Sequence, residues 1–103
     1  MSRLPTLLTM LAAEPTDAFL LFAIAKEHEK AGDDAQALAY YLQCAQHNPD
    51  YVGLYYHLGK LYERRNDIDT AVATYTQGIA VAQQAGDRHA ASELGAARME
   101  WEE

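Results

Sequence analysis

Residues 55–75 read YYHLGKLYERRNDIDTAVATY. Apolar side chains recur there every three or four residues, first at Tyr55, Leu58 and Tyr62 and again from Ala71 onward. This spacing places them on one face of a helix and argues against strands, whose side chains alternate every second residue. The stretch therefore predicts two helices joined by a short turn.

The turn itself is written in the residues Asn66 and Asp67. Asparagine tolerates the left-handed conformation that ends many helices, and aspartate is a favoured N-cap of the helix that follows. Gly32 and Asp33 repeat the signal earlier in the chain, where Gln36 gives Asp33 the spacing of a capping box. Each of these dipeptides predicts a boundary between two helices.

The chain repeats itself with a period of 34 residues. Sliding it by that distance aligns residues of many different types, which indicates repeated helix pairs rather than chance. The aligned pairs are Leu8 with Leu42, Pro15 with Pro49, Lys26 with Lys60, Glu29 with Glu63, Asp33 with Asp67, Ala37 with Ala71 and Tyr41 with Tyr75.

Proline at positions 15 and 49 closes each unit, because it cannot continue a helix and restricts the residue before it. The resulting prediction is an all-α chain with helices at 5–13, 17–31, 34–47, 51–65, 68–85 and 87–101. Small residues should lie where helices cross closely, at Ala25, Ala37, Gly59, Ala71 and Gly78, and Tyr41, Tyr62 and Tyr75 should fill the space between them.

This pattern resembles the tetratricopeptide-repeat family. Residues Tyr55, Leu58, Gly59, Tyr62, Ala71 and Tyr75 stand at the spacing of its signature, although Gln83 replaces the closing proline. The resemblance implies a right-handed α-solenoid of antiparallel helix pairs in a single domain, 1–103. Its parts would be a degenerate half-repeat at 5–13, full repeats at 18–51 and 52–85, and a capping helix at 87–102 after a lengthened helix.

Composition excludes several kinds of partner. The net charge is −7 and the chain holds few basic residues, so we expect no nucleic-acid binding. No apolar run is long enough to cross a membrane, and the run from Leu4 to Ala13, which could pass for a signal peptide, reads better as the half-repeat. The single cysteine, Cys44, fits a buried position in a soluble cytoplasmic protein.

Active-site signatures are missing from the sequence. Phosphate-binding glycine loops, nucleophile elbows and Cys-His dyads do not occur. The four histidines, at 28, 47, 57 and 89, do not pair at metal-binding spacing. We therefore expect no catalysis, no cofactor and no metal.

The resemblance implies a peptide- or protein-binding groove lined by the first helix of each repeat. All three lysines of this acidic chain fall there, which favours an acidic ligand; the alternative is that Lys26–Glu29 and Lys60–Glu63 are ordinary surface pairs. The lysine–asparagine clamp of chaperone-binding members is absent, since no asparagine lies on these faces. The expected groove residues are Phe19, Phe22, Lys26, Lys30, Tyr56, His57, Lys60 and Arg64.

A second hypothesis is self-association. Two full repeats are fewer than the roughly three that usually bury a continuous core. Near the chain end, Met99 and Trp101 are apolar where a polished terminus would be polar, so they are either an end cap or a homodimer contact.

Overall fold

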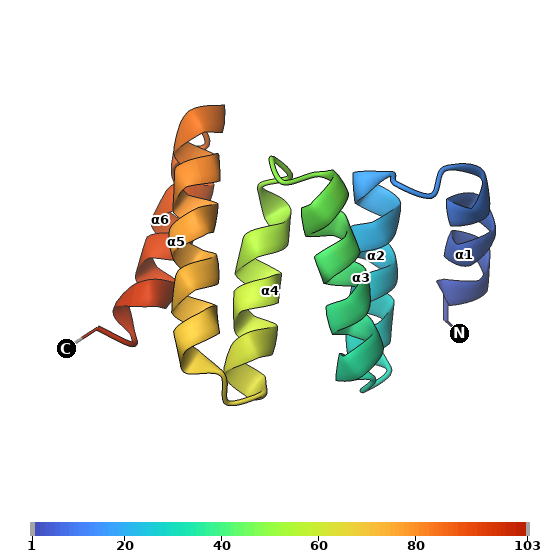
Figure 1. Ribbon diagram of the computed structural model, residues 1–103, viewed down its shortest axis with the longest axis horizontal. Helices are drawn as coiled ribbons and strands as arrows, with labels where there is room; N and C mark the ends of the chain where they lie inside the picture. The colour runs from blue at the N-terminus through green and yellow to red at the C-terminus, as the bar shows by residue number, and fades with distance from the viewer. Residues whose placement is uncertain (1, 103) are drawn as a thin grey trace. The chain divides into compact units, whose positions relative to one another are not determined.

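A computed structural model describes residues 2–102, and these hold six α-helices and no strand (Figure 1). Two predicted helices, at 34–47 and 68–85, have the bounds expected, and the other four differ by at most two residues at either end. The helices are α1 (Leu4–Ala13), α2 (Ala18–Lys30), α3 (Asp34–His47), α4 (Gly53–Arg64), α5 (Ile68–Ala85) and α6 (Arg88–Met99).

Aspartate N-caps begin four of these helices. In each, the carboxylate accepts a hydrogen bond from the backbone N–H three residues later, which satisfies one of the unpaired amides of the first turn. The bonds join Asp17 to Leu20 at 2.9 Å, Asp33 to Gln36 at 3.1 Å, Asp67 to Thr70 at 3.3 Å and Asp87 to Ala90 at 3.0 Å.

Left-handed residues end three of the helices. Gly32, Asn66 and Gly86 have φ angles of 82°, 62° and 73°. After the first two, the N–H of Asp33 and of Asp67 reaches back across the last turn to a carbonyl, at 2.8 Å and 2.9 Å. The predicted turn signals are therefore confirmed, with Asn66 taking the place that glycine holds at Gly32.

The chain forms two compact units, one ending at Tyr51 and the other beginning at Val52. In the first unit α2 packs against both α1 and α3. Leu7 of α1 meets Leu20 and Ile24 of α2 in a small apolar cluster, while Tyr41 and Cys44 of α3 are fully buried.

In the second unit α5 packs against both α4 and α6. Gly59 allows the closest approach: a Cβ built on it would lie 2.2 Å from Cε1 of Tyr75. Gly78 is nearly as tight, since its Cβ would lie 2.5 Å from that of Tyr55. The expected glycine crossings are confirmed, as is the longer helix before the last one, because α5 spans 18 residues against 14 in α3.

Two expectations about packing are wrong. Leu42, part of the apolar pattern of α3, is 44% exposed, and Tyr62 is only half-buried. Met99 and Trp101 are also exposed, so neither packs as a snug end cap. A periodic apolar residue is buried only where a neighbouring helix covers it, and periodicity alone does not reveal the neighbour.

We predict that Gly59→Ala destabilises the protein by about 1–3 kcal/mol, because the added methyl group overpacks the crossing against the buried Tyr75 ring. Ala25 holds the equivalent place in the first unit, so the position accepts alanine only where the helices are spaced for it.

The matched control is Gly95→Ala, where an added Cβ meets nothing within 4 Å. This change should stabilise α6 by about 0.5–1 kcal/mol through helix propensity. Urea unfolding followed by circular dichroism measures both, and equal effects of the two substitutions would contradict the close crossing.

Candidate functional site

The exposed face of α2 carries four of the predicted binding residues. Phe19 and Lys30 are exposed, and Phe22 and Lys26 are half-buried. The Phe22 ring lies 5.9 Å from that of Tyr41 and 5.6 Å from that of Tyr51, both tilted. Such contacts hold the ring in place at the edge of the first unit's core.

The face of α4 carries the other four residues. Arg64 is exposed, and Tyr56, His57 and Lys60 are half-buried. The ammonium of Lys60 lies 5.5 Å from the centre of the Tyr56 ring, within cation–π range, and 3.7 Å from a carboxylate oxygen of Glu63. His57 meets Tyr56 edge to face, with ring centres 5.7 Å apart.

A buried tyrosine stands behind each face. The hydroxyl of Tyr41 donates to Glu29 in the first unit, and that of Tyr75 donates to Glu63 in the second. Both pairs are 34 positions apart in register. The repeat therefore carries a four-residue arrangement on its first helix: an aromatic ring, a lysine and a glutamate, with the glutamate bound from below by the tyrosine of the second helix.

These bonds change the electrostatics of the faces. Glu63 is the more enclosed partner, with 15% of its side chain exposed against 31% for Lys60. Burial raises the pKa of Tyr75 above its ordinary value, and the hydrogen bond to Glu63 and the charge of that carboxylate raise it further. The carboxylate is thus turned toward the core, and the lysine is the charge that solvent meets.

The sequence-based analysis named the lysines and the aromatic rings but missed what fixes them. The hydroxyls of Tyr41 and Tyr75 were assigned only to packing, and Tyr51 was not considered. The signal was available, because the tyrosines and glutamates recur in the same register as the lysines. No hydrophobic pattern marks a hydroxyl as a donor, however.

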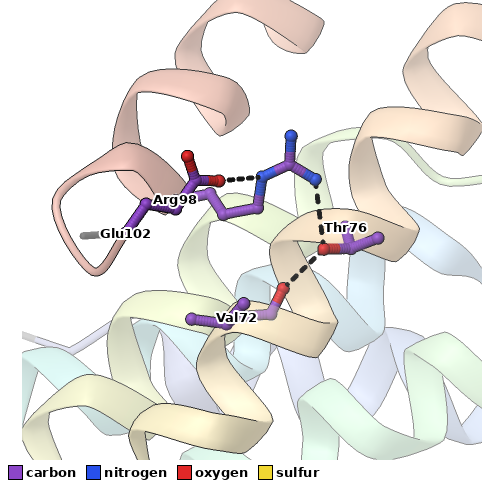
Figure 2. A network of polar contacts seen from close by, with 4 residues as sticks. All are labelled: Val72, Thr76, Arg98 and Glu102. Carbon is purple, nitrogen blue, oxygen red and sulfur yellow. Dashed lines mark hydrogen bonds and ion pairs between the residues drawn. The ribbon is translucent and has the colours of Figure 1, made fainter.

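The end of the chain is held by a separate polar network (Figure 2). Arg98 of α6 donates through Nη1 to the Thr76 hydroxyl of α5 at 3.2 Å, and that hydroxyl donates to the Val72 carbonyl at 2.9 Å. Nε of Arg98 lies 3.2 Å from Oε1 of Glu102. This network fixes α6 on α5 and ties the residues after α6 to it.

Other chemistry is sparse among residues 2–102. Cys44 is fully buried, and burial raises the pKa of its thiol to about 11, so little thiolate forms at neutral pH. Within the described part of the chain, no three histidine, cysteine or acidic side chains gather closely enough to hold a metal ion. No described helix is long and apolar enough to cross a bilayer.

Helix pairs repeated in register, with short polar turns and one aromatic–lysine face per pair, define the class of helical repeat proteins. A family model described as tetratricopeptide repeat matches residues 28–94. The chain belongs to this family, whose fold generally mediates protein–protein interaction and whose members are typically non-catalytic scaffolds.

Individual relatives agree. A TPR repeat-containing protein of Pseudomonas aeruginosa is 32% identical over 85 residues, which cover 82% of this chain and 81% of that protein. The crystal structure of a tetratricopeptide repeat domain protein of Salinibacter ruber is 46% identical, with a TM-score of 0.78, covering 82% of this chain and 93% of that one. A solution structure of a Bordetella parapertussis protein shares the fold at 24% identity and a TM-score of 0.82, covering 97% and 87%.

The raised pKa of Tyr75 gives a pH prediction. Tyrosine ionises near pH 10.0 in the unfolded chain but not in the buried site, so stability is full below pH 10 and falls as the pH rises above it. Each suppressed ionisation steepens the fall by about 1.4 kcal/mol per pH unit. In Tyr75→Phe the fall should be shallower by up to one proton, because Tyr51 and Tyr62 also have raised pKa values.

Denaturant unfolding at pH 9, 10 and 11 measures this difference. At pH 9 the Phe variant should be the less stable of the two, since it leaves the Glu63 carboxylate without its donor. Parallel pH profiles for both proteins would contradict the buried, hydrogen-bonded hydroxyl.

Proposed function

We propose that this protein binds a peptide or protein partner through the first helices of its repeats, α2 and α4, and performs no catalysis. The observation that carries the proposal is the repeated arrangement of Phe22 with Lys26 and Tyr56 with Lys60, each set backed by a glutamate that a buried tyrosine binds. Preorganised aromatic and cationic side chains bind a ligand at a smaller entropy cost than mobile ones.

The chemistry of these faces favours an acidic ligand with apolar side chains. All three lysines of a chain with net charge −7 lie on α2 and α4. Because Tyr41 and Tyr75 donate to the neighbouring carboxylates, a ligand carboxylate meets the lysines first. The exposed Phe19 ring and the Tyr56 ring supply apolar contact beside them. The lone buried thiol suits a reducing compartment such as the cytoplasm.

Self-association remains the alternative function. The exposure of Met99 and Trp101 beside the last helix is the observation that favours it. Under this alternative the chain is a structural subunit, and its lysines are ordinary surface charges.

An array of peptides that mix glutamate with leucine or phenylalanine tests the binding proposal, beside an identical array with glutamine in place of glutamate. We expect binding to the acidic set alone, weakened by salt because exposed charges are screened. Lys60→Glu should weaken the best peptide by about tenfold, or about 1.4 kcal/mol, through lost attraction and new repulsion.

Arg88→Glu is the matched control, since it makes the same change of charge at an exposed residue of α6. It should leave the affinity within about twofold. If both reversals weaken binding equally, only net charge matters and the assigned faces are wrong. If the glutamine array binds as well as the acidic one, the preference for acidic ligands is wrong.

A further inference from the structure

The helices at the two ends of the described chain each present an uncovered face, and the repeat register shows what such a face packs against. In α1 the diagnostic residue is Met10, which aligns with Cys44 in α3 and Gly78 in α5 at steps of 34 residues. Both of these are buried against the first helix of their own pair. The Cys44 thiol lies 3.6 Å from the Ala18 carbonyl of α2, and Gly78 meets Tyr55 of α4.

Met10, by contrast, is 50% exposed. α1 therefore packs on α2 through Leu7, as a second helix packs on the pair that follows it, but nothing covers the face that a second helix turns toward a first helix of its own. Exposed apolar area of this kind is a candidate contact surface.

α6 presents the opposite half of the same interface. Its Leu94-Gly95 step matches Leu58-Gly59 of α4, and Leu94 is buried as Leu58 is. Gly59 faces the ring of Tyr75 from the second helix of its pair, whereas a Cβ on Gly95 would meet nothing within 4 Å. Met99, one helical turn beyond Gly95, is 67% exposed. α6 thus has the face of a first helix without a second helix upon it.

The two uncovered faces also match in chemistry. In both complete pairs a tyrosine hydroxyl of the second helix binds a glutamate of the first. In register, Leu7 of α1 stands in the tyrosine's place and Met99 of α6 in the glutamate's. Both polar members of the bond are replaced by apolar ones, so neither helix brings a carboxylate or hydroxyl that the other leaves unpaired.

We propose that copies of this chain associate head to tail, with α1 of one copy packing on α6 of another as the second helix of a repeat. The occupant of each face is thus a second copy, because the contact continues an interface that the chain already forms twice, between α2 and α3 and between α4 and α5. α1 carries no charged side chain, so its burial desolvates no ion. The inference does not depend on peptide binding by α2 and α4.

Head-to-tail contacts are heterologous and do not close by themselves, so the assembly grows with concentration. Light scattering after size exclusion, and sedimentation velocity, should show an average mass that rises from about 11.4 kDa at low micromolar concentration past the dimer toward millimolar concentration. A constant monomer mass over this range overturns the proposal, as does a mass that stops at the symmetric dimer.

Two single variants each block one end. Met10→Asp places a charge on the α1 face, and Gly95→Arg fills the hollow on α6; the first residue is half exposed and the second has open space, so both variants should fold, as circular dichroism will show. Each variant alone should be monomeric at every concentration. Mixed in equal amounts, the intact α6 of one and the intact α1 of the other should give a heterodimer of twice 11.4 kDa and nothing larger.

Leu8→Asp is the control on the same helix. Leu8 is 39% exposed, but its counterparts Leu42 and Thr76 are exposed even within complete pairs, so this position lies off the proposed interface. Leu8→Asp should assemble like the parent protein. If it blocks assembly as strongly as Met10→Asp, or if the mixture of the two blocked variants stays monomeric, the assigned helix pair is wrong.

Discussion

The contact on which the second unit depends is the ring of Tyr75 lying over Gly59, with its hydroxyl bound to Glu63. The ring needs a residue without a side chain beneath it, which sets how closely α4 and α5 approach. Its hydroxyl, once buried, needs an acceptor, and the acceptor has to come from the helix it covers. One residue therefore specifies both the spacing of the pair and the chemistry one turn further along α4.

The same bond connects the core to the surface that we propose for binding. Glu63 faces Tyr75 on one side and Lys60 on the other, and Lys60 lies in turn over the Tyr56 ring. A solvent-exposed lysine would sample many rotamers, at a cost when a ligand fixes one. Here an acid held by the core and an aromatic face restrict it. Function and packing thus share residues, and a helical repeat can position a binding face without a loop.

Much of this could be predicted from the sequence. The turn residues Gly32 and Asn66 with their following aspartates fixed the helix boundaries closely, because capping depends on local contacts that the sequence contains. The lysines of α2 and α4 were also found by the period. What could not be predicted was exposure at Leu42 and the hydroxyl bonds, since both depend on which atoms of another helix lie within reach.

The ends were the hardest to predict for the same reason. Met99 and Trp101 were recognised as apolar, but whether they pack depends on a neighbour, and in the described chain both are exposed. The decisive clue was comparative within the chain: Gly95 has the sequence context of Gly59 and none of its contacts.

The account's central claim is that the bond from Tyr75 to Glu63 couples the core to the binding face, and a double-mutant cycle tests it most directly. Tyr75→Phe, Glu63→Ala and the double variant would be unfolded in urea at pH 7 and compared with the parent protein. We predict a coupling free energy of about 1–2 kcal/mol, as for a partly enclosed hydrogen bond to a charged group. Additive effects, with no coupling between the two residues, would contradict the claim.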